Sequence, residues 1–255
     1  MRSLKSPWKD WRRRRLLERH GVRPEPVGDV FRAGARSGTW AVRRAGLGPD
    51  SVVVSVGVGD NIAWDLAMAA EFGCQVHLCD PTPVSTAWLA RQELPEGVHH
   101  HPVAIAARDG TLSFRAPRRA GGVNFRPLEL PLHPEASVPP ERSVPPERAE
   151  PREPGAPPEP GDVTAPCERL STLATRLRVD RFDVLKLDIE GGELQVLPDL
   201  LAAGPAVGQL LVEFHHRHDG RDFARTLEQL RALEAHGYRL FDVSRRGLEL
   251  SFHRG

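Results

Sequence analysis

The first residues that could do chemistry form the run Gly57-Val58-Gly59-Asp60-Asn61. Glycines at a turn let the backbone bend sharply and come close to a ligand. Asp80 follows this turn at a separation of about 20 residues, the spacing at which a carboxylate accepts hydrogen bonds from a ribose. The pattern therefore predicts a nucleoside-binding turn, and an ordinary strand-to-helix turn is the alternative.

A second group of polar residues lies at the ends of two apolar runs. The run FDVLKLD (182–188) ends in Asp188, and the run QLLVEFH (209–215) carries Glu213 and His215. Open α/β sheets bind ligands at the carboxyl ends of their strands, so these side chains are candidates for a reaction centre. A neutral imidazole suits proton removal near pH 7, and we predict that His215 is a general base and that Asp188 positions it or the substrate. Alternatively, His215 only caps the end of a strand through a backbone hydrogen bond.

Asp188, Glu213 and His215 also suggest a metal site, because carboxylates and an imidazole suit Mg²⁺ or Mn²⁺. Such an ion would lower the pKa of a bound hydroxyl. A competing prediction is that Glu213 pairs with Lys186, since parallel strands that align Asp188 with His215 would also place Lys186 beside Glu213. A divalent metal is therefore considered but not favoured.

The sequence around the glycine turn predicts a strand, the turn, a helix and a second strand. Residues 51–56 are rich in valine, apolar residues recur at helical spacing over 61–72, and residues 75–79 form a second apolar run. Gly73 suits the end of the helix. A dinucleotide fingerprint requires a third glycine at position 62, which is Ile62, so a nicotinamide-linked oxidoreductase is disfavoured.

The remaining elements indicate an α/β fold. We predict a third strand over 99–107, a hairpin at Asp109-Gly110 that joins 105–107 to 111–114, and strands over 182–188 and 209–215. An amphipathic helix over 222–236 precedes two strands, 238–243 and 248–253. A terminal antiparallel hairpin after parallel strands separates this fold from the dehydrogenase type. His99, His100 and His101 are interpreted as a solvated strand start, because at most two of them could share an ion.

Composition limits the remaining possibilities. The chain has 255 residues, 40% hydrophobic content and a net charge of +1, so no overall field favours nucleic acid. Its 3 cysteines lack metal-ligand spacing and suit a reducing compartment. No apolar run is long enough to span a bilayer and no signal peptide is apparent, so we predict a cytoplasmic protein without a transmembrane segment. The sequence leaves the oligomeric state open.

The domain organisation follows from two changes in composition. Residues 1–29 form a basic arm that includes Arg12–Arg15, which we interpret as a solvated helix. Residues 30–255 form one domain, with a proline-rich insertion at 131–166 that contains the tandem repeat SVPPER at 137–142 and 143–148. So little apolar content predicts a disordered insertion.

Five segments in this order resemble the FkbM-type family of S-adenosylmethionine (SAM)-dependent methyltransferases: VSVGVGDN (54–61), CDPTP (79–83), LSTL (170–173), DVLKLDIEGGE (183–193) and LVEFH (211–215). The most specific segment is KLDIEGGE, similar to the family's Asp-x-Glu-Gly-x-Glu signature. The resemblance covers about residues 30–252, apart from the insertion. It implies a Rossmann-like class I methyltransferase fold, with a mostly parallel seven-stranded sheet and a C-terminal antiparallel hairpin.

The resemblance also implies roles for individual residues. Gly57, Gly59 and Asp60 would line the methionine end of SAM, with Val58 and Asn61 in the same turn. Asp80 would hold the ribose, the backbone at Ala104 and Ile105 would flank the adenine, and Asp188 would face the sulfonium or the acceptor. The implied reaction is O-methylation of a hydroxyl on a small-molecule acceptor such as a sugar or polyketide. A non-catalytic SAM-binding or interaction module is the alternative.

Overall fold

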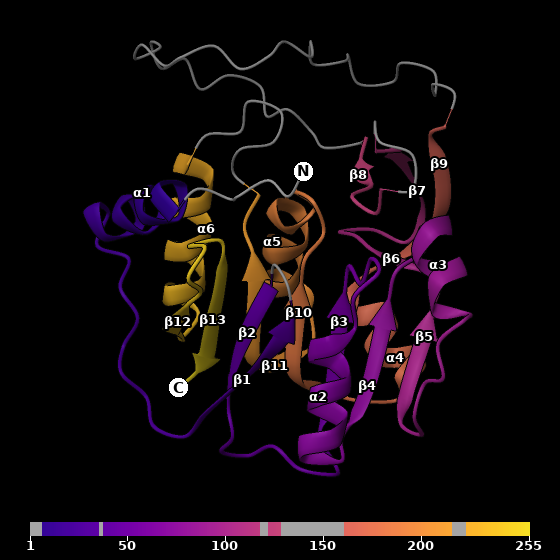
Figure 1. Cartoon of the computed structure of the whole chain (residues 1–255), viewed down its shortest axis with the longest axis horizontal. Coiled ribbons are helices and arrows are strands. Elements are labelled where there is room, and N and C mark those ends of the chain that lie inside the picture. The colour runs from indigo at the N-terminus through magenta and orange to yellow at the C-terminus, as the bar shows by residue number, and fades with distance from the viewer. Residues whose placement is uncertain (1–6, 36–37, 118–121, 129–160, 216–222) are drawn as a thin grey trace.

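The computed structural model describes residues 7–35, 38–117, 122–128, 161–215 and 223–255 (Figure 1). The helices are α1 (Pro7–Arg19), α2 (Ala63–Phe72), α3 (Pro83–Leu89), α4 (Leu170–Leu177), α5 (Glu193–Ala203) and α6 (Phe223–Ala235). The strands are β1 (Val30–Ala35), β2 (Gly38–Arg43), β3 (Val52–Val56), β4 (Gln75–Cys79), β5 (Val98–His101), β6 (Ala104–Ile105), β7 (Gly110–Arg115), β8 (Arg126–Pro127), β9 (Val163–Glu168), β10 (Arg181–Leu187), β11 (Ala206–Glu213), β12 (Tyr238–Val243) and β13 (Glu249–Arg254).

A seven-stranded sheet with the order β12-β13-β11-β10-β3-β4-β5 forms the centre of the molecule. Strands β11, β10, β3, β4 and β5 are parallel to one another. Strand β13 is antiparallel to both β11 and β12. The predicted fold, a mostly parallel sheet that ends in an antiparallel hairpin, is therefore confirmed.

The strands are apolar on both faces because helices cover both sides of the sheet. Alternate residues of one strand enter different cores: Val54 and Leu185 pack with α4, α5 and α6, whereas Val53 and Val184 pack with α2 and the β1–β2 hairpin. Figure 1 shows α2 and this hairpin on the same side of the sheet. The alternation places Lys186 on the face of Val184, toward α2 and β2.

The β1–β2 hairpin is fixed to the sheet through Arg43 and Gln209. The Arg43 backbone N–H donates to Gln209 Oε1 at 2.7 Å, and Gln209 Nε2 donates to the Arg43 carbonyl at 2.8 Å. Both arms of the hairpin, 30–35 and 38–43, are strands. The hairpin brings Trp40 against α2.

The second, smaller sheet differs from the prediction. Its order is β6-β9-β7-β8, so β6 and β7 do not pair as a hairpin around Asp109-Gly110. Strand β9 lies between them, parallel to β6 and antiparallel to β7. Residues 163–166 belong to this strand, although they were assigned to the end of the insertion. The expected extension of the third strand to 107 is also wrong, because β5 ends at His101 and β6 joins the other sheet. Most of the insertion lies outside the described residues.

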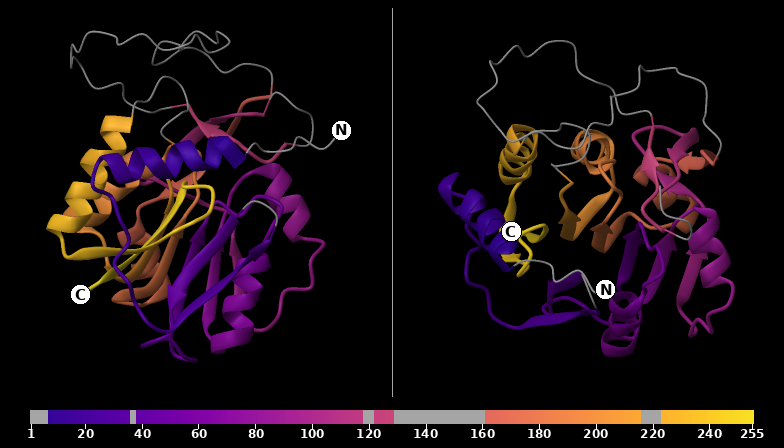
Figure 2. Two further views of the ribbon diagram at one scale, coloured as in Figure 1. Left: turned by 60° about the vertical axis from the view of Figure 1, so that its left-hand side comes forward. Right: turned by 45° about the horizontal axis from the view of Figure 1, so that its top comes forward.

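Helix α1 packs beside the C-terminal hairpin (Figure 2). Asp10 is buried and accepts from Arg245 Nη1 at 3.1 Å, and Leu17 is part of the core formed with α4 to α6. The predicted division into a 1–29 arm and a 30–255 domain stays a prediction. None of the described helices is both long enough and apolar enough to cross a membrane.

Candidate functional site

A cavity of about 350 Å³ opens at the carboxyl ends of β3, β4 and β10. This volume falls at the lower end of the range for small-molecule sites. All the residues predicted for cofactor binding line it: Gly57, Val58, Gly59, Asp60, Asn61, Asp80, Ala104, Ile105 and Asp188. Leu112 and Phe114 of β7 and Phe125 add an apolar wall.

The turn after β3 requires glycine at position 57 for two reasons. Gly57 has φ +81°, and a Cβ at this position would lie 1.7 Å from the carbonyl oxygen of Asp188. The backbones that follow β3 and β10 are therefore in direct contact, which only a residue without a side chain permits. Gly59 also has positive φ, at +60°. Asn61 Oδ1 accepts from the Ala63 N–H at 3.2 Å, close to the start of α2.

Asp80 holds the glycine turn in place. Its Oδ2 accepts from the backbone N–H groups of Val58 at 3.0 Å and Gly59 at 2.9 Å. Its Oδ1 accepts from the N–H of Thr82 at 2.9 Å and from Thr82 Oγ1 at 2.7 Å. A carboxylate has about four acceptor sites, and protein donors use this number. The role of Asp80 toward a ribose stays a prediction, and it would require Asp80 to share these acceptor sites.

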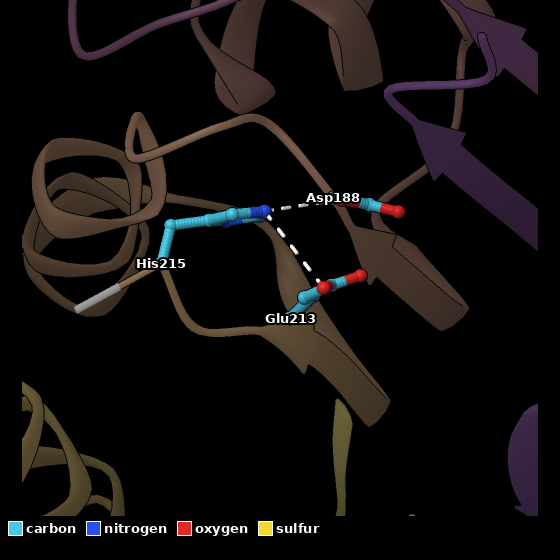
Figure 3. Close-up of side chains that lie close together, drawn as sticks. All are labelled: Asp188, Glu213 and His215. Atoms are coloured by element: carbon cyan, nitrogen blue, oxygen red, sulfur yellow. Dashed lines mark ion pairs between the residues drawn. The ribbon is translucent and has the colours of Figure 1, made fainter. Parts of the chain in front are cut away.

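Asp188, Glu213 and His215 converge in one cluster (Figure 3), in which one ligand atom from each lies within 4.8 Å of the others. His215 Nε2 is 3.7 Å from Asp188 Oδ1 and 4.0 Å from Glu213 Oε1. The Asp188 side chain is 31% exposed, whereas that of His215 is 7% exposed, so Asp188 is the more accessible of the pair. The predicted juxtaposition of Asp188 and His215 is therefore present. The cluster also contains the atoms that a divalent ion would need, so the metal alternative stays a prediction.

The charge state of His215 depends on Glu193, which begins α5. Burial opposes a charged imidazole, but the contact of His215 Nδ1 with Glu193 Oε1 at 3.4 Å outweighs it and, with nearby carboxylates, raises the pKa of His215 to about 10. Burial also raises the pKa of Glu193, but His215 reverses this effect and lowers it. The structure thus favours an imidazolium near pH 7 and argues against the neutral imidazole expected of a general base.

The predicted pair between Lys186 and Glu213 is wrong. Lys186 aligns with Leu211 in the β10–β11 register instead of Glu213, and no hydrogen bond or ion pair joins the two side chains. Lys186 Nζ donates to Ser55 Oγ at 3.2 Å. Glu213 instead accepts from Arg246 Nη2 at 3.4 Å. Burial, assisted by the charge of Asp188, raises the pKa of Glu213 to about 8.

The three consecutive histidines have separate partners. The ring of His99 contacts Gln75, that of His100 contacts the Asp80 carbonyl, and that of His101 contacts His77 at 3.0 Å. No described group of three potential metal ligands includes these histidines. His99 is exposed and the other two are half-buried, so only part of this strand start is solvated.

No role was predicted for several residues at the site. Glu190 has φ +51° and a pKa raised mainly by burial, and its Oε2 lies 3.8 Å from His215 Nε2. Arg246 reaches the cavity from the β12–β13 turn. Trp64 and Asp65 reach it from α2. The acidic pattern 188–193 could have indicated Glu190, but nothing in the spacing pointed to Asp65 or Arg246.

The strand order, the terminal hairpin and the cavity after β3 together define the class I methyltransferase fold. The FkbM methyltransferase domain matches residues 54–240. The chain therefore belongs to the FkbM family of methyltransferases.

Two further comparisons add little to this assignment. Among solved structures, the chain is similar to a protein described as the Methanococcus jannaschii fibrillarin pre-rRNA processing protein. The two share 11% sequence identity over 81% of this chain and 67% of the other, with a TM-score of 0.42. A similarity at this level carries no functional argument. No protein with a curated function matches the sequence.

Proposed function

We propose that this protein is a SAM-dependent methyltransferase that methylates a hydroxyl group of a small molecule. The observation that supports the proposal best is the position of Asp188 and the glycine turn in one cavity, in a chain of the FkbM family. The cavity fits the cofactor in chemical terms, because it combines the glycine turn and Asp80 with an apolar wall at Ala104, Ile105 and Phe114. We also propose that the protein acts in the cytoplasm.

When bound, SAM supplies a methyl group already activated on a sulfonium, so the protein must bind, orient and remove one proton. The glycine turn and Asp80 would hold the adenosyl part, and Ala104 and Ile105 would flank the base. These residues would fix the direction from which a hydroxyl oxygen can approach. The task that remains is removal of the hydroxyl proton, which falls to other side chains of the site.

Asp188 is the proposed proton acceptor. A hydroxyl oxygen that accepts an activated methyl group would become strongly acidic, so a carboxylate would be a sufficient base. The hydroxyl proton would move to a carboxylate oxygen of Asp188. His215, charged through its contact with Glu193, would position Asp188 from 3.7 Å. This assignment replaces the neutral-base role for His215 with a positioning role.

The test begins with calorimetric titration of SAM and S-adenosylhomocysteine, followed by a transfer assay over hydroxylated small molecules. We expect both compounds to bind and S-adenosylhomocysteine to form with at least one acceptor. Binding without transfer to any acceptor would support the alternative, a non-catalytic SAM-binding module. Absence of binding by both compounds would contradict the proposed function.

A further inference from the structure

Two buried side chains of opposite charge type line the cavity at the end formed by β2, α2 and β10. Asp65 is 1% exposed and Lys186 is 4% exposed. Lys186 lies next to the indole rings of Trp40 and Trp64, and both tryptophans line the same cavity as Asp65 and Lys186. No hydrogen bond or ion pair joins Asp65 to Lys186.

The carboxylate of Asp65 lacks donors within the part of the chain that the structure describes. Neither of its two oxygens accepts a hydrogen bond there. Its position in the first turn of α2 gives it some favourable interaction with the helix dipole, but no donor. Burial of a carboxyl group without donors is costly unless something else supplies them. The residue therefore indicates a missing donor in the cavity.

Lys186 is only partly satisfied. An ammonium group has three N–H donors, and the described residues provide one oxygen acceptor, Ser55 Oγ at 3.2 Å. The ammonium otherwise faces two aromatic rings, with Nζ 5.4 Å from the centre of Trp40 and 5.8 Å from that of Trp64. Ring faces stabilise a cation but do not accept strong hydrogen bonds. Lys186 therefore retains capacity for an acidic ligand group.

We propose that Asp65 and Lys186 bind the α-amino acid group of the cofactor, with Asp65 accepting from its ammonium and Lys186 donating to its carboxylate. The inference rests on the proposed function, because SAM carries such a group on the opposite side of its sulfur from the adenosine. A zwitterionic group would supply the donor that Asp65 lacks and a second oxygen acceptor for Lys186, beside Ser55. It also leaves the cavity without added net charge.

The sheet order supports this placement. Strand β3, with its glycine turn, lies between β10, which carries Lys186, and β4, which ends beside Asp80. Ala104 and Ile105 line the same cavity and follow β5, the strand that lies on the far side of β4 from β3. An adenosyl group near Asp80 and an amino acid group near Lys186 would therefore place the sulfur close to Gly57 and Asp188. This order agrees with the proton-accepting role of Asp188.

The test uses S-adenosylhomocysteine and methylthioadenosine, which shares the adenosyl sulfur but lacks the amino acid group. Calorimetry is carried out with the wild-type protein, Asp65→Asn, Lys186→Met and the control Glu71→Gln, which changes a carboxylate on the same helix outside the cavity. We expect each of the first two variants to weaken S-adenosylhomocysteine binding by about tenfold or more, because each removes a charge-assisted hydrogen bond. Methylthioadenosine should bind to all four proteins within about twofold of one another.

Two ligand analogues show which ligand group contacts Asp65 and which contacts Lys186. Removal of the α-amino group from S-adenosylhomocysteine should abolish the effect of Asp65→Asn, and removal of the carboxylate should abolish that of Lys186→Met. Without ligand, Asp65→Asn should raise Tm, because a buried carboxylate without donors is removed.

Different results overturn the inference and the proposed function. The inference would be overturned if the variants lost equal affinity for S-adenosylhomocysteine and for methylthioadenosine. It would also be overturned if both variants bound S-adenosylhomocysteine as well as the wild-type protein does. The proposed function would stand in either case. If neither ligand binds to the wild-type protein, the proposed function fails and the inference fails with it. If an acceptor that carries an amino acid group loses affinity while S-adenosylhomocysteine does not, the subsite belongs to the acceptor, and the inference is overturned.

Discussion

His215 Nδ1 lies 3.4 Å from Oε1 of Glu193, a side chain that is 1% exposed. Glu193 also accepts the backbone N–H of His215 at 2.7 Å and that of Gly191 at 2.8 Å. One buried carboxylate thus connects the end of β11 to the turn before α5. The contact orders the site and maintains the positive charge on the imidazole.

Replacement of Glu193 by Gln should lower the pKa of His215 from about 10 toward the ordinary histidine range. The amide retains much of the shape but removes the negative charge that stabilises the imidazolium. A pH titration of the His215 ring signals by NMR measures this change. Glu234→Gln, an exposed change on α6, is the control, and an unaltered His215 titration in Glu193→Gln would contradict the explanation.

Asp188→Asn should reduce the rate of methyl transfer by about 10²- to 10⁴-fold while S-adenosylhomocysteine still binds, because the amide cannot accept the proton. The measurement combines single-turnover kinetics with calorimetry. Asp180→Asn, an exposed change just before β10, serves as the control. Full activity of Asp188→Asn would remove Asp188 from the proposed chemistry.

Gly57→Ala should destabilise the fold far more than Gly46→Ala. Both glycines have φ +81°, so both variants carry a similar backbone cost of about 1–2 kcal/mol. Only at position 57 would the new Cβ meet a backbone oxygen, at 1.7 Å, whereas Gly46 has nothing within 4 Å. Urea unfolding of both variants measures the difference. Similar losses of unfolding free energy in the two variants would show that the contact with the Asp188 carbonyl adds no cost of its own.

Chelation of divalent ions should leave methyl transfer unchanged. The imidazolium of His215 and the guanidinium of Arg246 already place positive charge beside Glu213, so a divalent ion is not needed to balance this carboxylate. The assay follows S-adenosylhomocysteine release before and after EDTA treatment, then with added Mg²⁺ or Mn²⁺. Activity that is lost on chelation and restored by either ion would instead favour a metal site at Asp188, Glu213 and His215.

Acid should destabilise the protein partly through His77. Burial, assisted by the positive charge of neighbouring groups, lowers the pKa of His77 from 6.5 to about 4. Between these values the unfolded chain binds more protons than the folded one, so this contribution to stability is present above pH 6.5 and lost as pH falls through 4. Unfolding free energies measured over this range should fall less steeply for His77→Gln than for the wild-type protein. Parallel curves would contradict the explanation.

The main sheet could be predicted because its strands are short apolar runs that end in polar residues. The runs before Gly57, Asp80 and Asp188 indicate buried parallel strands, and all three end at the cavity. The two apolar runs at 238–243 and 248–253 indicated the terminal hairpin, and the family resemblance implied the same topology. Local pattern and tertiary structure agree in this part of the chain.

Register and charge could not be predicted in the same way. The β10–β11 alignment places Lys186 beside Leu211, a two-residue difference that no local pattern encodes. Strand β9 enters the smaller sheet from beyond the insertion, so the turn chemistry of Asp109-Gly110 was overridden by a distant segment. The charge on His215 depends on Glu193 from another element.

The pairing of Phe114 has a consequence for chain length. This residue pairs with Pro127 on one edge of β7 and with Val163 on the other, so the chain departs and returns only two strand spacings apart, or about 10 Å. A handful of residues can cover that distance. Replacing 129–160 with a short glycine-serine bridge should therefore preserve the apolar wall. The full length of 129–160 is therefore not needed to connect β8 to β9.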